Sequence, residues 1–301
     1  MSRPAKTKPA AGARPYAAFA RKYRPLSFEE VVGQEAVGRT LRGALRAGEI
    51  PSSFLFAGPR GVGKTTMARI LAKALNCAEA DAPTPDPCGK CATCEAIADG
   101  SSLDVVEVDA ASHNGVDDVR EIRERVAHLP AAGRYKVYIL DEAHMFSTAA
   151  WNAFLKTLEE PPSHAKFVFA TTEPEKVPET ILSRCQRFDF RRIQSRDIVL
   201  TLRSIVEKEN AERGKDRAIV VSDAALAAVA RFARGGLRDA ESLLEQAVLA
   251  GEGKVREEDL AALLGSVPRE MVRAALERAS AGDAAGTGPP SSARRWRCSA
   301  N

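Results

Sequence analysis

Short apolar runs alternate with amphipathic segments over the first two thirds of the chain. The runs are rich in Val, Ile, Phe and Tyr, and we expect each to be a strand: Ser53–Ala57, Leu103–Asp109, Lys136–Asp141, Lys166–Thr172 and Arg187–Phe190. Near-continuous apolarity is typical of strands that helices cover on both faces of a sheet. The pattern therefore predicts an α/β fold with a mostly parallel sheet.

Two segments between these runs carry clear helical signals. A helix is expected to follow Lys64, because apolar residues recur there on a single face: Met67, Ile70, Leu71, Ala74 and Leu75. A second helix should begin near Ser147 and must end before Pro161, because proline cannot continue a helix.

The pattern changes after Ser195, where apolar residues recur at helical spacing and no further strand is expected. Ser195 and Ser222 each precede such a run, at the position of a helix N-cap. Gly235-Gly236 separates the second helix of this region from a third. We therefore expect a core over residues 16–194, a small helical domain over 195–265 and the start of a truncated further domain over 266–281.

The two ends of the chain lack periodicity. Residues 1–15 are mostly Ala, Pro, Lys and Arg without an apolar segment, which predicts a disordered basic tail rather than a signal peptide. Residues 282–301 have no usable pattern, and we expect a disordered or aberrant tail at a truncated C-terminus. No stretch approaches the roughly 18 consecutive apolar residues of a membrane span. We therefore expect a cytoplasmic protein without membrane contact.

The composition changes this picture only slightly. Of the 301 residues, 45% are hydrophobic and 28% are charged, as in globular proteins, which argues against a membrane or disordered class. The formal net charge of +4 permits a polyanionic partner but does not establish one.

A phosphate-binding pattern follows the first expected strand. Residues 58–65 read Gly-Pro-Arg-Gly-Val-Gly-Lys-Thr and match G-x-x-x-x-G-K-[ST] at the start of a helix. Backbone N–H groups and the helix N-terminus can surround a phosphate there. A glycine-rich turn that contains a lysine by chance is the alternative, and its flanking strand and helix disfavour it. The expected nucleotide-binding residues of this segment are Gly58, Arg60, Gly61, Val62, Gly63, Lys64, Thr65 and Thr66.

An acidic pair at the end of another expected strand supplies the second half of such a site. We expect Lys64 to neutralise the β- and γ-phosphates of ATP, and Thr65 and Asp141 to ligate Mg²⁺. Glu142 would orient the attacking water, which favours an ATPase over a passive binder. The alternative is a surface acidic pair after a buried strand. His144 completes a helicase-like DEAH pattern, which we regard as coincidence because only one such core is present.

Four of the six cysteines lie close together in the sequence. Cys88 and Cys91 form a Cys-x-x-Cys pair, Cys94 follows at the same spacing, and Cys77 lies upstream. Four thiolates suit a structural tetrahedral Zn²⁺ site, on which the loop over 76–98 would depend for folding. A redox pair is the alternative, but it leaves two cysteines unexplained. Cys185 is expected to be a packed residue.

Several short motifs occur in the order and spacing of a known family. Over about residues 16–280 the chain resembles AAA+ clamp-loader ATPases, the γ/τ family of bacterial DNA polymerase III. The motifs are Ala20-Arg21-Lys22-Tyr23-Arg24-Pro25, Phe28, Val31-Val32-Gly33-Gln34, Leu158-Glu159-Glu160-Pro161-Pro162, Ala170-Thr171-Thr172, Leu182-Ser183-Arg184-Cys185 and Gly236-Leu237-Arg238-Asp239-Ala240.

The resemblance implies a fold and a set of residue roles. The fold would be an AAA+ P-loop core with a zinc module inserted over 76–98, followed by a small helical lid domain. Adenine would contact the segment that contains Arg24, Pro25 and Val32. Thr172 would be a first sensor, Arg238 a second sensor, and Arg184 an arginine finger that completes the site of an adjacent subunit.

The resemblance also implies an activity and partners. It predicts an ATP-hydrolysing motor of the DNA polymerase III holoenzyme, which opens the sliding clamp and loads it onto primed DNA. Partners would be the other subunits of a hetero-pentamer, the sliding clamp, and the phosphate backbone of primer–template DNA. Arg120, on a helix after Asn114-Gly115, could touch that backbone or could lie on a solvated surface helix.

Two other interpretations remain open at this point. The chain could be another AAA+ DNA-processing motor, for branch migration or helicase loading. It could also be an inactive truncated scaffold that cannot assemble, because the family assembles largely through a C-terminal helical collar.

Overall fold

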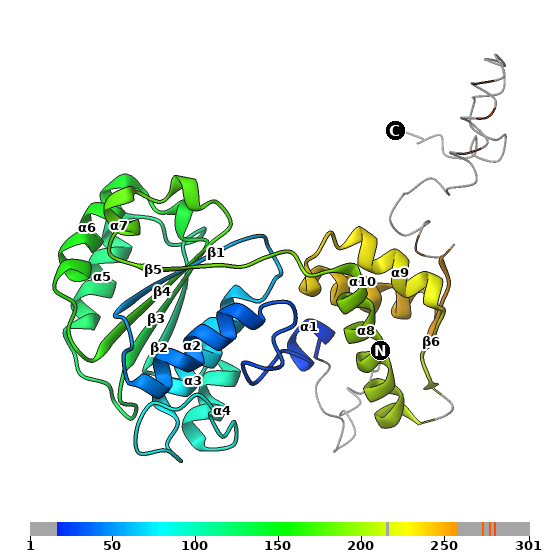
Figure 1. Ribbon diagram of the computed structural model, residues 1–301, viewed down its shortest axis with the longest axis horizontal. Coiled ribbons are helices and arrows are strands. Elements are labelled where there is room, and N and C mark those ends of the chain that lie inside the picture. The colour runs from blue at the N-terminus through cyan, green and yellow to red at the C-terminus, as the bar shows by residue number, and fades with distance from the viewer. Residues whose placement is uncertain are drawn as a thin grey trace, which may run out of the picture.

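The computed structural model describes residues 17–214 and 217–257, together with Leu260, Arg273, Glu277 and Ser280. The two expected tails, over 1–15 and 282–301, lie outside these residues, as does most of the expected collar segment over 266–281. Figure 1 shows two bodies, a larger one built on a sheet and a smaller one built of helices.

A five-stranded parallel sheet forms the centre of the larger body. Its strand order is β2-β3-β4-β1-β5, and all four neighbouring pairs are parallel. The expected α/β fold with a parallel sheet is confirmed. The strands are β1 (Ser53–Ala57), β2 (Val105–Asp109), β3 (Lys136–Asp141), β4 (Ala165–Thr171) and β5 (Gln186–Asp189).

Side chains of the central strands alternate between two hydrophobic cores. Phe54 and Phe56 of β1 face the core under α2 (Glu35–Ala47) and α3 (Lys64–Asn76). Leu55 faces the opposite core, with helices α5 (Val116–Val126) and α6 (Thr148–Glu159). Helices therefore cover both faces of the sheet, as Figure 1 shows. The edge strands β2 and β5 are only partly buried, because each has a neighbour on one side alone.

The helix boundaries follow local signals in the sequence. Helix α3 begins directly after Gly63, whose φ of +102° favours glycine. Helix α6 begins after Ser147, whose hydroxyl accepts a hydrogen bond from the Ala150 N–H at 3.2 Å. The remaining elements of this body are α4 (Ala92–Asp99), η1 (Ala143–Met145), η2 (Pro174–Lys176) and α7 (Glu179–Leu182).

The smaller body contains the helices α8 (Ser195–Arg213), α9 (Asp223–Phe232) and α10 (Leu237–Ala250). Ser222 caps α9 as expected, and its hydroxyl accepts from the Ala225 N–H at 3.2 Å. Ser195, in contrast, is the first residue of α8 rather than its N-cap, which is Gln194.

The expectation that strands end after Ser195 was wrong. Two short parallel strands, β6 (Val220–Val221) and β7 (Lys254–Val255), pair beside the helices. A two-residue strand is too short to show the alternation by which strands are recognised, and this pairing joins segments that are far apart in the chain.

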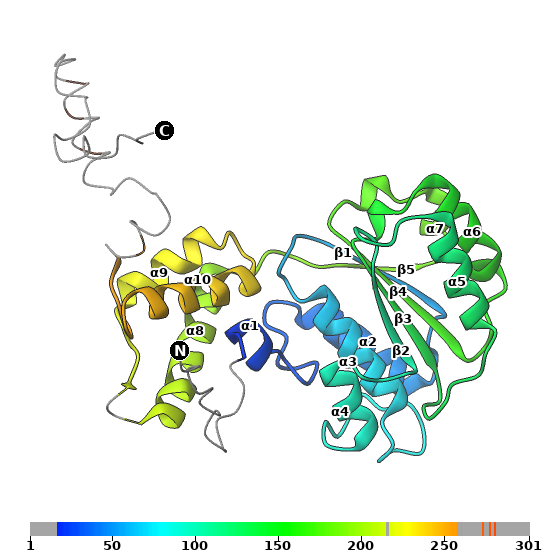
Figure 2. The same cartoon turned by 180° about the vertical axis from the view of Figure 1, so that it is seen from behind.

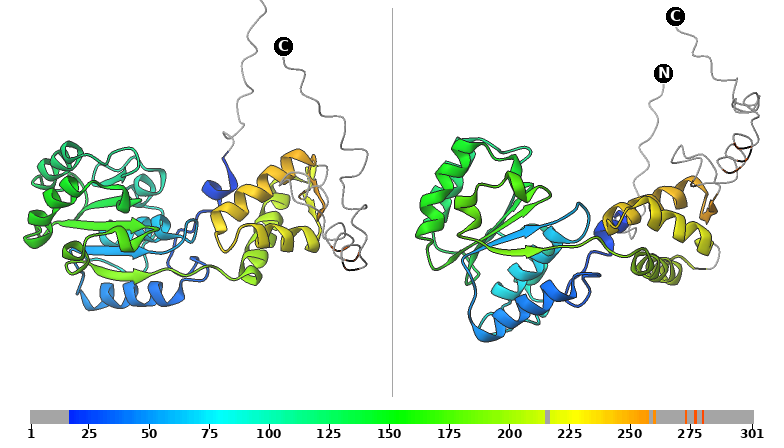
Figure 3. Two further views of the ribbon diagram at one scale, coloured as in Figure 1. Left: turned by 90° about the horizontal axis from the view of Figure 1, so that it is seen from above. Right: turned by 45° about the horizontal axis from the view of Figure 1, so that its top comes forward.

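The first described helix, α1 (Phe19–Lys22), packs on the smaller body although it precedes the core in the chain. Phe19 is buried among the lid helices, and its N–H donates to Glu245 Oε1 at 3.2 Å. The Lys22 ammonium lies 2.7 Å from Glu209 Oε1 of α8. The views from behind and from above show α1 against these helices (Figures 2 and 3). The chain therefore passes between the two bodies twice, after α1 and again after β5.

None of the described helices combines the length and the apolar character that a membrane crossing requires.

Candidate functional site

Glycine shapes the loop between β1 and α3. A Cβ on Gly58 would lie 2.4 Å from the carbonyl oxygen of Phe190, so no larger residue fits. Gly61 and Gly63 have φ values of +73° and +102°, which side chains rarely tolerate. The loop therefore takes a backbone course that requires glycine at these positions, which is compatible with the predicted phosphate-binding pattern.

Lys64 occupies the centre of this loop. Its ammonium donates hydrogen bonds to the carbonyl oxygens of Gly58 and Pro59, each at 2.8 Å. The residue is only 6% exposed. Burial lowers the pKa of Lys64, and the nearby carboxylates of Asp141 and Glu142 act in the opposite direction. The Lys64 ammonium therefore lies near two carboxylates and is bound by two neutral carbonyl oxygens, which a phosphate can replace.

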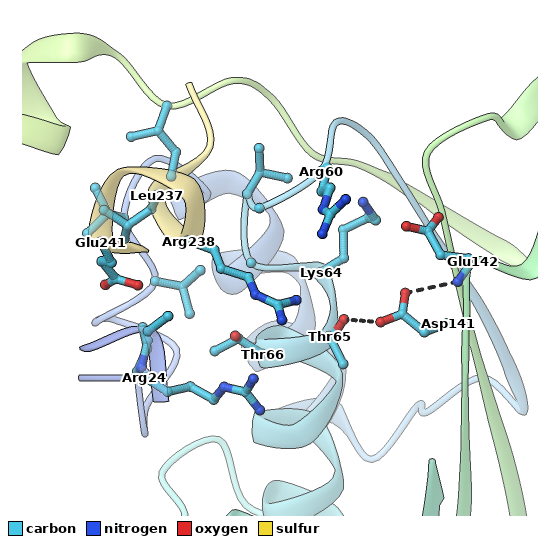
Figure 4. Close-up of a pocket in the computed structure, with 18 of the residues that line it drawn as sticks. Arg24, Arg60, Lys64, Thr65, Thr66, Asp141, Glu142, Leu237, Arg238 and Glu241 are labelled. Atoms are coloured by element: carbon cyan, nitrogen blue, oxygen red, sulfur yellow. Dashed lines mark hydrogen bonds between the residues drawn. The ribbon is translucent and has the colours of Figure 1, made fainter. Parts of the chain in front are cut away.

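The two residues predicted to ligate magnesium lie in contact. The Thr65 hydroxyl, in the first turn of α3, donates to Asp141 Oδ2 at 2.7 Å. Asp141 ends β3, so the sheet brings a residue 76 positions away to the phosphate loop. Glu142 follows with a φ of 47°, and its N–H donates to Asp141 Oδ1 at 3.0 Å. Figure 4 shows this chain of contacts. Oxygen ligands from a hydroxyl and a carboxylate suit Mg²⁺.

Glu142 also contacts the end of the neighbouring strand. The Thr172 hydroxyl, directly after β4, donates to Glu142 Oε2 at 3.1 Å. His144 lies beside the pair, with Nδ1 3.1 Å from Thr171 Oγ1 and Nε2 3.1 Å from Glu173 Oε1. The motif comparison alone gave His144 no role, whereas the structure buries it next to Glu142. A histidine that fixes Thr171 also fixes the strand end from which Thr172 extends.

These groups surround a cavity of about 430 Å³. Most of the residues predicted from the sequence line it, namely Arg24, Pro25, Val32, Arg60, Gly61, Val62, Gly63, Lys64, Thr65, Thr66, Asp141, Glu142 and Arg238. Gly58, Thr172 and Arg184 are outside the lining. Gly58 nevertheless binds Lys64 and Thr172 binds Glu142, so two of these three still touch a residue of the site.

The lid closes one side of the cavity. The Arg238 N–H, at the start of α10, donates to the Gly61 carbonyl at 3.3 Å. A Cβ on Gly61 would lie 3.3 Å from Gly236 Cα, so the absence of a side chain permits this approach. The Arg238 side chain extends towards the start of α3, as does that of Arg24 (Figure 4). Burial and the neighbouring Arg69 lower the pKa of Arg24, and Arg238 contributes in the same direction. With Arg60, three of the described arginines line the cavity, and together they favour a polyanionic ligand.

Gln34 fixes another part of the cavity wall. Its side chain is buried, donates to the Arg191 carbonyl at 2.7 Å and accepts from the Arg191 N–H at 3.1 Å. This pair ties the Val-Val-Gly-Gln motif to the segment that connects β5 with α8. The motif thereby positions Val31 and Val32 at the cavity.

Several lining residues were not among the predicted site residues, although Ala20, Val31 and Leu237 stand in the motifs quoted above. These lining residues are Ala20, Val31, Glu107, Asp109, Ala111, Ile193, Leu237 and Glu241. Asp109 had an available signal, because it ends an expected strand as Asp141 does. The two residues are paired in the parallel register of β2 and β3.

Arg184 lies on the surface, away from the cavity of its own chain. Its guanidinium donates to Glu159 Oε1 at 2.8 Å and to the Thr180 carbonyl at 2.6 Å. About a third of its side chain is exposed. The geometry therefore leaves its predicted role in another subunit untested.

The four cysteines predicted to bind zinc converge in space. The sulfur atoms of Cys77, Cys88, Cys91 and Cys94 all lie within 4.8 Å of one another. Zinc–sulfur bonds of about 2.3 Å place tetrahedral sulfurs about 3.8 Å apart, so the cluster fits this ion. The Cys88 N–H donates to Cys77 Sγ at 3.4 Å and the Cys91 N–H donates to Cys88 Sγ at 3.3 Å, as in a metal knuckle.

The thiols differ in their acidity. Burial disfavours the thiolate of Cys91, but backbone N–H donors from Cys94 and Ala78 lower its pKa to about 6. Burial raises the pKa of Cys185 to about 12, and that residue packs against the core under α5 and α6, away from the cluster. The four clustered thiols are therefore compatible with a zinc site. Cys185 lies outside the cluster, and its thiol is expected to be unreactive.

Comparison with known proteins agrees with this geometry. A family model described as "DNA polymerase III, delta subunit" matches residues 33–194, and one described as "DNA polymerase III clamp loader subunit, ATPase lid domain" matches 197–253. The DNA polymerase III subunit tau of Bacillus subtilis is 50% identical over 252 residues. The chain belongs to the γ/τ family of DNA polymerase III clamp-loader subunits.

The fraction of the relative's length that the alignment covers differs from one γ/τ subunit to another. The alignment covers 84% of this chain and 43% of the Bacillus subtilis protein. The DNA polymerase III subunit gamma of Buchnera aphidicola is 40% identical, and 85% of this chain covers 67% of that protein. The chain thus spans about half the length of most of the γ/τ relatives that it matches.

Solved structures confirm the fold of this γ/τ-family chain. The RuvB Holliday junction branch migration motor of Thermotoga maritima superimposes with a TM-score of 0.53 at 20% identity. The superposition covers 79% of this chain and 71% of that one. Identity at this level supports a shared AAA+ fold and nothing more specific.

Proposed function

We propose that this chain is an ATP-hydrolysing motor subunit of the DNA polymerase III clamp loader, which opens the sliding clamp and loads it onto primed DNA. The observation that carries the proposal is the convergence of Lys64, Thr65 and the Asp141–Glu142 pair on one cavity that Arg238 of the lid closes. Family membership supports the replication role. A cytoplasmic location follows, because bacterial replication takes place there.

The residues around the phosphate loop have distinct proposed tasks. The glycine loop and Lys64 bind the triphosphate, and the hydroxyl of Thr65 and carboxylate of Asp141 hold the cation. A magnesium ion bound there would neutralise developing phosphate charge. Glu142 orients and activates the attacking water, and Thr172 holds the Glu142 carboxylate in place through their 3.1 Å contact.

Two of the arginines at the cavity, Arg24 and Arg238, are proposed to respond to the nucleotide. Arg238 is carried by the lid, so its contact with a phosphate would pull α10 towards the loop that already touches it at Gly61. Binding energy at the phosphate would thereby be converted into movement of the smaller body. Arg24, Pro25 and Val32 are proposed to contact the adenosine part.

Arg184 is proposed to act as an arginine finger on the ATP of an adjacent subunit. Its partly exposed ion pair with Glu159 contributes little stability, so the guanidinium can exchange Glu159 for a phosphate. A cation supplied in this way typically accelerates hydrolysis about 10³–10⁵-fold. The isolated chain should therefore hydrolyse ATP slowly.

The cysteine cluster is proposed to hold a structural zinc ion. Four protein ligands leave no open position for a substrate, which is typical of structural and not of catalytic sites. The ion would fix the segment between α3 and α4.

Partners are proposed on the same basis: other clamp-loader subunits in a hetero-pentamer, the sliding clamp, and the phosphate backbone of primer–template DNA. Helix α5, which follows Gly115, is the proposed DNA element. Arg120 on this helix pairs with Asp117 at 2.7 Å, and a phosphate would have to replace that exposed carboxylate.

The decisive experiment compares ATP turnover of the chain, reconstituted with loader subunits, in the presence and absence of clamp and primed DNA. We expect strong stimulation by both together and none by a four-way junction. Stimulation by the junction alone would favour a branch-migration motor. ATP binding without assembly or turnover would identify an inactive scaffold and contradict the proposal.

Two variants separate the steps of this reaction. Glu142→Gln should bind ATP with nearly unchanged affinity and lose turnover, because the amide cannot activate water. Arg184→Ala should also bind ATP but lose about 10³-fold or more in turnover, in the assembly only. Unchanged turnover of the Arg184 variant in the assembly would remove its proposed role.

A further inference from the structure

Helix α10 presents a second charged residue to the cavity besides Arg238. Leu237, Arg238 and Glu241 all line it, and Figure 4 shows them on one side of the helix. Residues 237 and 241 are four positions apart and therefore share a helix face. Glu241 has no task in the proposed hydrolysis.

The Glu241 side chain is largely buried at the cavity. The residue is 5% exposed, and no hydrogen bond or ion pair joins its side chain to any residue in the described part of the chain. Burial raises its pKa to about 8, although the positive charges of Arg24 and Arg238 act against this shift. A buried carboxyl without a partner is costly, and a ligand in the cavity can offset that cost.

Glu241 lies at the end of the cavity remote from the phosphate loop. In Figure 4, Glu241, Leu237 and Arg24 gather on one side, whereas Lys64, Asp141 and Glu142 gather on the other. Apolar residues also line the cavity, namely Pro25, Val31, Val32, Ile193 and Leu237. Apolar residues of this kind suit contact with a nucleoside, and Glu241 lines the same cavity.

The chemistry of a nucleotide limits what Glu241 can bind. A triphosphate carries only hydrogen-bond acceptors and negative charge, so it repels the carboxylate form of Glu241 and offers no donor to either of its oxygens. The donors of ATP are the ribose hydroxyls and the 6-amino group of adenine. We propose that Glu241 is a specificity-determining residue that accepts a hydrogen bond from one of these nucleoside donors. The inference rests on the proposed ATP site.

The first test needs no variant. Calorimetric titration of the whole chain compares ATP with three analogues: 2′-deoxyATP, 3′-deoxyATP and purine riboside triphosphate, which lacks the 6-amino group. We expect the analogue without the recognised donor to bind about tenfold or more weakly, because it would leave a buried acceptor oxygen without a partner. The weak analogue identifies the donor. Equal affinities for all four nucleotides would overturn the proposal.

The second test removes the acceptor. Glu241→Leu should bind all four nucleotides within about twofold of one another, whereas Glu241→Gln, which keeps an acceptor oxygen, should retain part of the discrimination. Discrimination unchanged in Glu241→Leu would also overturn the role of Glu241. Absence of ATP binding by the unaltered chain is a different result, because it would overturn the ATP site itself and this inference with it.

Discussion

The two ends of helix α3 belong to sites that are built in opposite ways. At its beginning, Lys64 and Thr65 meet groups from three distant segments, including Asp141 on β3 and Arg238 on the lid. At its end, Asn76 leads into a cluster whose four sulfurs come from residues 77–94, within one contiguous stretch. One site is thus assembled by tertiary structure and the other by local sequence.

This difference has a physical consequence for how each site is held together. The phosphate loop is backed by the sheet, and β1 is buried along its whole length. The cysteine loop has only Cys94 and Ile97 buried in α4, and its own side chains supply little core. A short segment with little buried apolar area needs a metal or a disulfide to stay folded. We therefore expect the nucleotide site to be preformed and the cysteine loop to depend on metal.

The largest expected effect concerns Lys64. Lys64→Ala should weaken ATP binding at least about 100-fold, because it removes the charge that faces the phosphates. Its metal content should stay unchanged, since the helix separates the two sites by about 20 Å. Calorimetry and metal analysis of the same preparation check this. Tight ATP binding by the variant would refute the phosphate-loop assignment.

Replacement of two of the clustered cysteines should abolish zinc binding and leave the nucleotide site intact. The unaltered chain should contain about one zinc ion, and Cys88→Ser/Cys91→Ser should contain none. The loop over 77–94 should then become sensitive to protease, while ATP affinity changes by less than about threefold. Cys185→Ser is the matched control and should keep its zinc. A zinc-free unaltered chain would overturn the four-thiolate site.

Asn76 couples the cysteine loop to the core. Its side chain accepts from the N–H groups of Arg134 and Tyr135 at 2.9 and 2.8 Å, and donates to the Tyr135 carbonyl at 2.9 Å. Asn76→Ala should lower the free energy of unfolding by about 3 kcal/mol, because it leaves buried backbone groups unpaired. Asn152→Ala, at an exposed position of α6, should change it by less than about 0.5 kcal/mol. Equal urea midpoints for the two variants would contradict this role.

The smallest expected effect is pH-dependent and concerns Asp104. Its carboxylate binds residues 131–133, directly before the two residues that Asn76 binds. Burial opposes ionisation of its carboxyl, but N–H donors of Gly133, Ala131 and Ala132, at 2.6 to 2.8 Å, lower its pKa below 3.8. Stability from a lowered pKa is present above the unfolded value and is lost as the pH falls through the folded value.

Asp104→Asn should therefore cost about 1–2 kcal/mol at pH 7. The difference from the unaltered chain should shrink as the pH falls below about 4. Urea titrations at pH 7 and pH 3 measure it. A difference that is constant across this range would show that the carboxylate charge is not involved.

Much of the fold and of both sites could be predicted before the structure. The bounds of β1 and β3 match the apolar runs, because buried central strands leave a strong signal over five or six residues. The phosphate loop, the acidic pair and the cysteine spacing were readable since each is a local pattern with its own chemistry. The short strands β6 and β7 escaped prediction because two residues cannot show a period.

The sequence by itself determined which groups this protein can use: a glycine loop with Lys64, carboxylates at a strand end, and four closely spaced thiols. Only the tertiary structure decided which distant residues join them. It brought Asp109 beside Asp141, His144 beside Thr171, and Glu241 to the cavity. The reason is that these neighbours are set by strand order and by packing of the lid. Both depend on long-range burial that no local spacing records.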